Sequence, residues 1–153
     1  MKDVKFKLKL GQIDYTNIRV APVINCMVRY NGKILIVQRN SSMKFYPGYW
    51  NGISGFLDDK KSVEQKAKDE LKEEIGLEEN NIINIIEGEL FEQEEPKYDK
   101  TWIVHPVLVE VRTDNIKLDW EAENYKWIEP ERIKDFKLVP GFGRVLEILL
   151  DLE

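Results

Sequence analysis

Apolar and polar residues alternate in several parts of the chain, and this two-residue period predicts strands. Residues 4–10 alternate apolar side chains with lysines, which favours a strand with one wetted face. Residues 20–29 and 34–38 are two apolar runs, and Asn31-Gly32 lies between them. Asn-Gly is typical of a two-residue hairpin turn, because both turn positions require positive φ angles. We therefore predict a β-hairpin from these two runs.

A helical period of 3.6 residues follows in the middle of the chain. Ser62 stands before the periodic stretch and Gln65 stands three residues later. This is the pattern of a capping box, in which Ser62 caps the first turn and the Gln65 side chain reaches back. Gly76 follows the stretch and can take the left-handed conformation that ends many helices. These signals predict a helix from Val63 to Ile75.

Weaker signals assign the rest of the chain. Residues 40–59 contain Pro47 and three glycines, and we expect an irregular loop there. The remaining apolar runs predict strands at 82–91, 101–111 and 125–128, and closing helices at 130–136 and 139–152. Because strands and helices mix without strict alternation, we expect a mixed sheet flanked by helices.

Composition limits the class of protein. The 153 residues fit one domain, residues 1–153, with 42% apolar and 33% charged residues, as in a soluble globular protein. The net charge of −5 argues against a nucleic-acid groove, which needs clustered lysines and arginines. Cys26 is the only cysteine, so no intrachain disulfide can form, and we expect a cytoplasmic location. The N-terminal residues lack the apolar core of a signal peptide, and no apolar run approaches a membrane span, so we expect no membrane partner.

The predicted helix carries three glutamates, Glu70, Glu73 and Glu74. Their spacing of i, i+3 and i+4 puts them on one face of the helix. Each adjacent pair of like charges costs roughly 0.2–0.5 kcal/mol, so a divalent cation that neutralises the cluster is favoured. Hard cations such as Mg²⁺ prefer carboxylate oxygens and bring phosphate groups with them. The pattern therefore indicates a metal site that handles phosphate.

The direction in which these glutamates point separates a functional site from an ordinary solvated acidic surface. At about 100° per residue, Glu70 and Glu74 fall beside the apolar stripe that contains Val63 and Ala67. They should therefore point partly inward, where a carboxylate needs a cation, a basic partner or a raised pKa. Lys66, four residues before Glu70, is the best purely structural explanation.

Residues 55–77 resemble the signature box of the Nudix family, which reads Gly, five residues, Glu, seven residues, then Arg-Glu-apolar-x-Glu-Glu-x-Gly-apolar. The matching positions in this chain are Gly55, Glu70, Leu71, Glu73, Glu74, Gly76 and Leu77. Outside the box, residues 34–39 resemble the strand that precedes the family's loop, and Trp50 resembles the aromatic residue before the box. The agreement at fixed spacing makes the resemblance specific.

Two positions of the box depart from the family pattern. Lys61 stands where the family has glutamate, and Asp69 stands where it has arginine. In the family these positions resemble a structural ion pair between loop and helix, and here both signs are reversed together. The resemblance therefore implies a swapped pair of Lys61 with Asp69. Decay of the box after loss of catalysis is the alternative, although random decay would be expected to reach the metal carboxylates, and all three remain.

The resemblance implies an α/β/α sandwich built on a mixed sheet. It also implies a hydrolase that uses Mg²⁺ or Mn²⁺ to cleave the diphosphate bond of a nucleoside diphosphate linked to another group, with a small nucleotide as substrate. Glu74 would be the main metal ligand, Glu70 and Glu73 would complete the cluster, and the backbone carbonyl of Ser54 would be a further ligand. Glu70 and Glu74 are thereby also the expected catalytic residues of the box.

The catalytic base of such an enzyme often lies on a later loop, outside the box. The resemblance places it in the acidic run 119–123, where Glu121 is favoured over Glu123 and an ordinary loop acid is the alternative. Arg39 could hold a phosphate in a bidentate contact, and pairing with an acid is the alternative. Trp50 could stack on a nucleobase, and packing against strands is the alternative.

Two other functions have to be weighed. A catalytically silent Nudix-fold module that binds a nucleotide would be favoured if Lys61 pointed into the metal site and replaced the cation. A Nudix-fold isomerase is disfavoured, because that chemistry resembles sites that use a cysteine and an additional acid, and Cys26 lies in an apolar run typical of a core. The sequence leaves the nucleotide derivative unidentified and a homodimer open.

Overall fold

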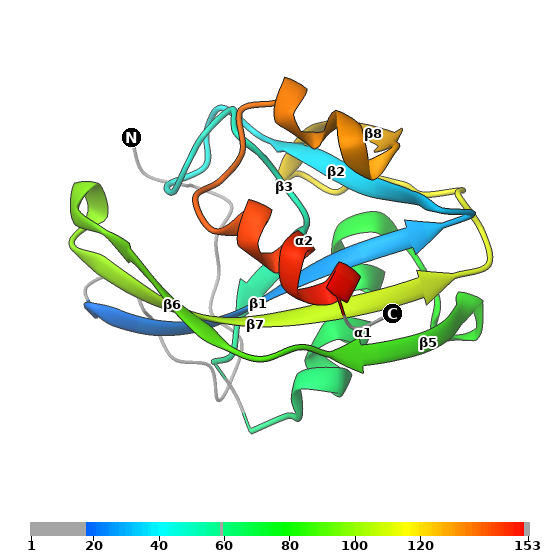
Figure 1. The fold of residues 1–153 in the computed structure, drawn as a ribbon, viewed down its shortest axis with the longest axis horizontal. Helices are drawn as coiled ribbons and strands as arrows, with labels where there is room; N and C mark the ends of the chain where they lie inside the picture. Colours follow the sequence, from blue (N-terminus) through cyan, green and yellow to red (C-terminus); the bar gives the residue numbers. More distant parts are fainter. Residues whose placement is uncertain (1–17, 59, 152–153) are drawn as a thin grey trace.

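The computed structural model describes residues 18–58 and 60–151 of the chain. The strand expected at residues 4–10 lies outside these described residues. Within the described part, the strands form one mixed sheet that is covered by helices (Figure 1). No helix of this part is long and apolar enough to cross a membrane.

The first two strands form the hairpin that the sequence predicts. Strand β1 (Val20–Tyr30) pairs antiparallel with strand β2 (Lys33–Arg39). Asn31 and Gly32 in the turn have φ angles of 52° and 78°. Both angles are positive, as a two-residue Asn-Gly turn requires. The predicted hairpin is therefore confirmed.

The sheet is mixed because its central strand pairs in both directions. The other strands are β3 (Trp50–Asn51), β4 (Ile53–Phe56), β5 (Ile82–Glu87), β6 (Phe91–Glu95), β7 (Lys100–Val111) and β8 (Ala122–Ile128). β1 pairs antiparallel with β2 and β4, and parallel with β7. Neighbouring strands follow the order β3-β2-β1-β7-β5 through the sheet. Three strands lie off this path: β4 pairs with β1, β6 pairs with β7, and β8 pairs with β2.

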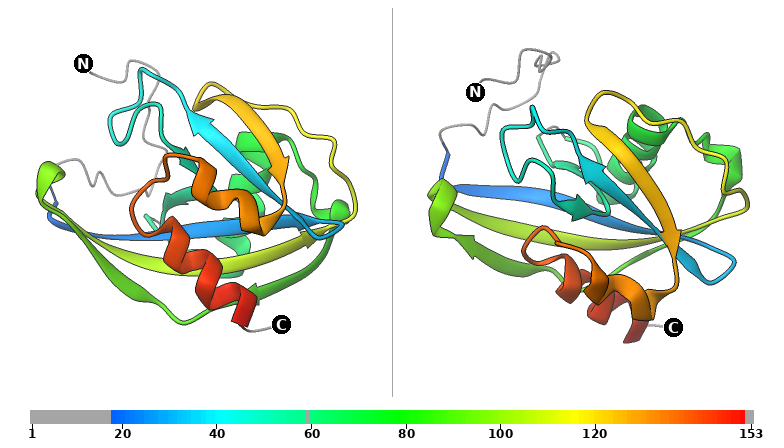
Figure 2. Two further views of the ribbon diagram at one scale, coloured as in Figure 1. Left: turned by 45° about the horizontal axis from the view of Figure 1, so that its top comes forward. Right: turned by 90° about the horizontal axis from the view of Figure 1, so that it is seen from above.

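The two helices lie on opposite faces of the sheet. Figure 2 shows α1 (Val63–Ile75) on one face and α2 (Phe142–Asp151) on the other. Side chains alternate along β1, so Ile24 and Cys26 belong to the core under α1, while Met27 belongs to the core under α2. The arrangement is the α/β/α sandwich with a mixed sheet that the sequence predicts.

Helix α1 has the limits that the sequence predicts. Ser62 Oγ accepts a hydrogen bond from the Gln65 backbone N–H at 3.1 Å, and Gly76 ends the helix with a φ of 65°. The Gln65 side chain does not complete the predicted capping box. Its Nε2 instead donates a hydrogen bond to Asp69 Oδ1 at 3.0 Å, four residues further along the helix.

Two strand assignments differ from the sequence prediction. The segment 40–59 is not wholly irregular, because it contains β3 and β4, and β4 pairs with β1. The strand predicted at 82–91 is divided into β5 and β6 around Gly88. A Cβ at Gly88 would approach Ile148 of α2 to 2.9 Å, so the chain passes close under this helix where it leaves β5.

The closing helices also differ in kind and in length. Short 3₁₀ helices are η1 (Glu79–Asn81), η2 (Pro96–Tyr98) and η3 (Pro130–Asp135). The helix predicted at 130–136 is therefore a 3₁₀ helix, a form that proteins use in short connecting pieces. Helix α2 begins at Phe142 instead of Val139. Gly141, with a φ of 96°, lies outside the helical region and delays its start.

Candidate active site

The acidic face of α1 is turned partly toward the interior, as its position beside the apolar stripe predicts. Glu70 and Glu74 are 9% and 8% exposed, whereas Glu73 is exposed to solvent. Gly55 on β4 lies against Glu70, and a Cβ at this glycine would be 2.6 Å from Glu70 Oε1. A side chain at this position would therefore displace the Glu70 carboxylate.

Glu74 carries the unsatisfied atom of this face. Its Oε2 is buried and has no hydrogen-bond partner among the described residues. Burial raises the pKa of Glu74 well above its usual range, and the charges of Glu121 and Glu70 raise it further. Burial also raises the pKa of Glu70. The face therefore presents a carboxylate oxygen that is unpaired and has other acids close to it.

The loop between β7 and β8 brings a further acid to Glu74. The Asp119 backbone N–H donates to the backbone oxygen of Glu74 at 3.0 Å, which ties the loop to the end of α1. The Glu121 N–H donates to Asp119 Oδ1 at 2.9 Å and fixes the turn between them. The Asn40 N–H donates to the backbone oxygen of Glu121 at 2.8 Å. The backbone of Glu121 is thus fixed by Asp119 at its N–H and by Asn40 at its carbonyl oxygen. The charge of Glu121 is close enough to raise the pKa of Glu74.

Asp119 belongs to the same cluster, although sequence reasoning does not single it out. Burial raises the pKa of Asp119, and the charge of Glu73 adds to the effect. The acidic run 119–123 is visible in the sequence, but only the contact with α1 shows which of its acids face the helix. Glu123, the less favoured candidate base, is exposed and accepts a hydrogen bond from the Ser41 N–H at 3.0 Å.

Arg39 lies beside these acids. It is the last residue of β2, and its Nε donates to the backbone oxygen of Phe45 at 2.8 Å. Burial lowers the pKa of Arg39, and the charges of Glu121 and Glu74 oppose this shift. The structure therefore places the guanidinium group of Arg39 close enough to Glu121 and Glu74 to interact with their charges.

Trp50 and Ser54 have different surroundings. Trp50 on β3 packs edge-to-face on Phe136, with ring centroids 5.3 Å apart, and it adjoins the core under α2. These are packing contacts on the face of the sheet opposite α1, so the structure does not bring Trp50 to the acids. Ser54 lies on β4, where its hydroxyl accepts a hydrogen bond from Asn51 Nδ2 at 3.3 Å. It directly precedes Gly55, which places its backbone near Glu70.

Two lysines neutralise acids of α1. Lys61 Nζ lies 2.6 Å from Asp69 Oδ2, so the swapped pair expected from the sequence is confirmed. Lys66 is 5% exposed, and its Nζ lies 3.2 Å from Asp58 Oδ1 and 3.5 Å from Glu70 Oε1. The spacing of four residues predicts the contact between Lys66 and Glu70. The contact with Asp58 depends on the path of the preceding loop, and sequence reasoning misses it.

The donor atoms of the cluster suit a hard divalent cation. They are carboxylate oxygens, which Mg²⁺ and Mn²⁺ prefer, and Glu74 Oε2 is buried without a partner in the described part of the chain. In the same part, no three acidic, histidine or cysteine side chains are already gathered in a group that could hold a metal ion. The cluster therefore fits the ion by its chemistry, and side chains would have to turn toward one point to bind it.

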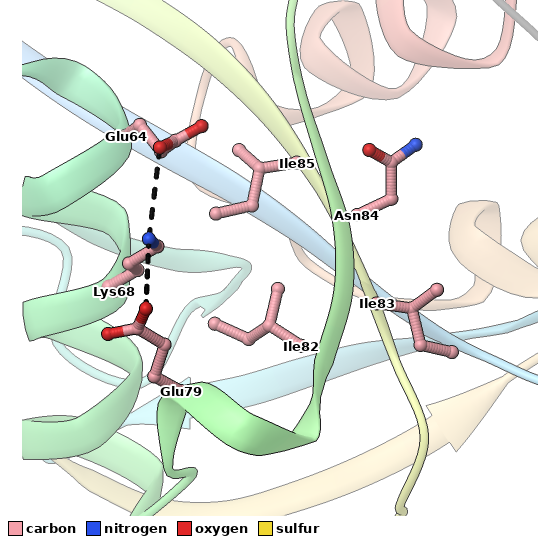
Figure 3. Close-up of a pocket in the computed structure, with 7 residues that line it drawn as sticks. All are labelled: Glu64, Lys68, Glu79, Ile82, Ile83, Asn84 and Ile85. Atoms are coloured by element: carbon pink, nitrogen blue, oxygen red, sulfur yellow. Dashed lines mark hydrogen bonds and ion pairs between the residues drawn. The ribbon is translucent and has the colours of Figure 1, made fainter.

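A hollow of about 290 Å³ lies elsewhere, between α1 and β5 (Figure 3). Figure 3 shows Lys68 of α1 between Glu64 and Glu79, with Ile82 and Ile85 pointing toward the helix. Lys68 Nζ lies 3.8 Å from Glu64 Oε2 and 3.2 Å from Glu79 Oε2. None of the candidate residues from the sequence lines this hollow, and its charged groups pair with one another. The candidate active site is therefore the acidic cluster and not the hollow.

Cys26 has the surroundings of a core residue. It is fully buried in the core under α1. Burial raises the pKa of its thiol, and the charge of Glu70 acts in the same direction. Since the thiolate is the reactive form of cysteine, Cys26 is not suited to catalysis.

Comparison with known proteins identifies a family model over most of the chain. The model described as NUDIX domain matches residues 19–148. A comparison with curated proteins found no match. An Ap4A hydrolase from C. elegans, solved as a binary complex, matches with 20% sequence identity and a TM-score of 0.70, and the match covers 86% of this chain and 96% of that chain.

Two further solved structures have the same fold. The NUDIX domain of NrtR from Shewanella oneidensis, complexed with ADP ribose, matches with 15% identity and a TM-score of 0.72, covering 86% of this chain and 87% of that chain. A bifunctional NMN adenylyltransferase/ADP ribose pyrophosphatase from Francisella tularensis, complexed with AMP and a Mn ion, matches with 22% identity and a TM-score of 0.67. That match covers 86% of this chain and 41% of the other. At these identities the likeness shows a shared fold.

Proposed function

Because the chain belongs to the Nudix family, as the match over residues 19–148 shows, we propose that it is a hydrolase that uses Mg²⁺ or Mn²⁺ to cleave a diphosphate bond in a nucleotide derivative. The observation that carries the proposal is the buried Glu74 carboxylate. Its Oε2 has no partner among the described residues, and Glu70 and Glu121 lie close to it. Like charges in the interior are unfavourable unless a proton or a cation neutralises them, and a divalent cation can take the place of the proton that the raised pKa of Glu74 favours.

In this proposal the acids of α1 hold the ion. Glu74 is its main ligand, and Glu70, Glu73 and the backbone carbonyl of Ser54 complete the set. Gly55 gives the Glu70 carboxylate the space it needs, since a Cβ there would be 2.6 Å from Glu70 Oε1. When bound, the ion would polarise a phosphate oxygen and lower the pKa of the attacking water.

Residues outside the helix bind the substrate and move the proton. Water attacks one phosphorus of the diphosphate, and the bond from that phosphorus to the bridging oxygen breaks. Glu121, fixed by its turn with Asp119 and by Asn40, accepts the proton of the attacking water. Arg39 binds the phosphate that leaves or the one that is attacked, because its guanidinium lies at the edge of the cluster. Trp50 stays outside this set, since it packs beside the core under α2.

The substrate class follows from the names of the structural neighbours and from the proposed chemistry. One neighbour is a hydrolase of Ap4A, one is bound to ADP ribose, and one is an ADP ribose pyrophosphatase. Ap4A and ADP ribose both contain a nucleoside joined through phosphoanhydride bonds to a second group. We extend this class, a nucleoside diphosphate linked to another group, to the present chain.

A second candidate is a catalytically silent module that binds a nucleotide. Lys61 gives it no support, because Lys61 pairs with Asp69 on the surface side of α1. The observation in its favour is Lys66, whose buried ammonium already lies 3.5 Å from Glu70 Oε1 and supplies positive charge there. In such a module Lys66 would take the place of the divalent cation.

A phosphate-release screen separates the two candidates. Nucleoside triphosphates, dinucleoside polyphosphates, ADP-ribose and nucleotide sugars are incubated with the full chain and Mg²⁺ or Mn²⁺. We expect hydrolysis of at least one of these groups, and we expect chelation of the metal to abolish it. Binding of a nucleotide without hydrolysis in either metal would support the silent module instead.

A further inference from the structure

Asp58, Lys66 and Glu70 form a buried ionic triad at the side of the acidic cluster. Asp58 lies in the loop before α1 and is 6% exposed, and Lys66 is 5% exposed. The ammonium of Lys66 lies 3.2 Å from Asp58 Oδ1 and 3.5 Å from Glu70 Oε1. Charges at this depth are stable only when they are paired. Lys66 is therefore held between one carboxylate of the loop and one of the helix.

Glu70 belongs both to this triad and to the proposed metal site. The charge of Lys66 opposes the rise that burial gives to the pKa of Glu70, so the ammonium acts on this carboxylate electrostatically. A divalent cation bound to the same face would be a second positive charge near Glu70. Two cations near one carboxylate repel each other, so each weakens the binding of the other. Asp58 acts in the opposite sense, because it offsets the charge of Lys66.

We infer that Lys66 sets how tightly the acidic face of α1 binds a divalent cation, and that Asp58 limits this effect. The inference rests on the proposed function, since it concerns the same site. Lys66 acts through Glu70 and is a positioning residue, not a catalytic one. The fold thereby supplies part of the neutralising charge itself and lowers the affinity of the site for metal.

The charge of the triad gives a ranking that distinguishes this role from simple structural support. With both carboxylates ionised, the two carboxylates and one ammonium of the triad carry a formal charge of −1. Lys66→Met changes this charge to −2, Asp58→Asn changes it to 0, and the double variant returns it to −1. Metal affinity should follow this order. If the triad only supported the fold, both single variants would weaken the site in the same direction.

The test is the binding of Mn²⁺ alone to the full chain, measured by calorimetry or by electron paramagnetic resonance. We expect Lys66→Met to bind about tenfold more tightly and Asp58→Asn about tenfold more weakly than the native protein, with the double variant close to native. Lys68→Met is the matched control. It removes a lysine from the same helix, but one that pairs with Glu64 and Glu79 at the hollow between α1 and β5. Its affinity for Mn²⁺ should be unchanged.

Thermal unfolding without metal adds a second readout. Lys66→Met leaves Asp58 and Glu70 without their shared ammonium, so it should melt at a lower temperature than the native protein. Added Mn²⁺ should then raise its melting temperature more than it raises that of the native protein. A smaller rise would contradict the inference, because it would mean that the ion does not compensate for the missing ammonium.

The outcomes separate the inference from the proposed function. If the native protein binds no Mn²⁺, the proposed function fails and the inference fails with it. If the native protein binds Mn²⁺ but folded Lys66→Met binds it no more tightly, only the inference is overturned. Should Lys66→Met not fold, the other two variants decide. The inference is supported if Asp58→Asn binds Mn²⁺ more weakly than the native protein and the double variant binds it with native affinity. It is overturned if Asp58→Asn and the double variant bind Mn²⁺ equally weakly.

Discussion

At the scale of single residues, the site depends on how closely side chains are allowed to approach one another. Gly55 lets β4 pass beside the Glu70 carboxylate, and the tie between Asp119 and Glu74 brings Glu121 to the helix. The inward direction of Glu70 and Glu74 follows from the helical period and is predictable from sequence. The approach of Asp119 to Glu74 and of Asp58 to Lys66 is not predictable from sequence, because each aspartate lies in a loop whose path depends on tertiary contacts.

Gly55→Ala tests the close approach at the site. The added Cβ would lie 2.6 Å from Glu70 Oε1, so the carboxylate has to move. A displacement of about 1 Å at a reacting centre costs about a hundredfold in rate, and we expect a loss of turnover of this order. Gly143→Ala in α2 is the control, since a Cβ there would meet nothing within 4 Å. Equal turnover in the two variants would show that the position of Glu70 does not matter.

At the scale of elements, α1 and the loop before it act as one unit. Ser62 and Gly76 set the limits of the helix, and its stripe of apolar residues fixes which face is buried. All of this is local in sequence, which is why the sequence predicts the helix correctly. β3 and β4 escape prediction because strands of two and four residues are too short to show a period. They exist because they pair with β2 and β1.

The pair between Lys61 and Asp69 tests the bracing of this unit. The pair is partly exposed and is expected to contribute only about 0–1 kcal/mol to stability, so activity is the better readout. In the native protein, Lys61 Nζ lies 2.6 Å from Asp69 Oδ2. Lys61→Glu replaces this attraction with repulsion between two carboxylates, and it should lower turnover. Adding Asp69→Arg restores attraction with the usual polarity and should recover most of the loss.

The double-mutant cycle isolates the coupling between these two positions. If the double variant is no more active than Lys61→Glu, the pair does not brace the site. If Lys61→Glu alone raises a weak starting activity, then Lys61 was suppressing the metal site. The silent binding module would then be the better description of this protein.

At the scale of the whole molecule, the sheet and its two helices bring distant segments of the chain to one place. The acids of residues 70–74 and 119–121 and the guanidinium of Arg39 come from a helix, a loop and a strand end. The fold class is predictable from the mix of strand and helix periods together with the box. The parallel pairing of β1 with β7 is not, because parallel pairs depend on contacts far apart in the sequence.

The stability of the whole molecule should respond to the metal. A cation that binds only the folded state stabilises it by mass action, by about 2.7 kcal/mol at a concentration about a hundred times its Kd. For a domain of this size that corresponds to a rise of about 5–10 °C in melting temperature. Calorimetry with and without millimolar Mg²⁺ measures the rise. An unchanged midpoint at saturating Mg²⁺ would argue against a metal site in the native protein.

The most direct test of the account is the turnover of Glu74→Gln with Mg²⁺ and a substrate found in the phosphate-release screen. Gln has nearly the same shape as Glu but cannot supply the unpaired, buried carboxylate oxygen at this position. We predict a fall in turnover of at least about a hundredfold. The fold should be retained without metal, because a buried acid with a raised pKa is replaced by a neutral group. Glu64→Gln, an exposed change on the same helix, should keep native turnover. Native turnover in folded Glu74→Gln would contradict the assignment of Glu74 as the main metal ligand and, with it, the proposed active site.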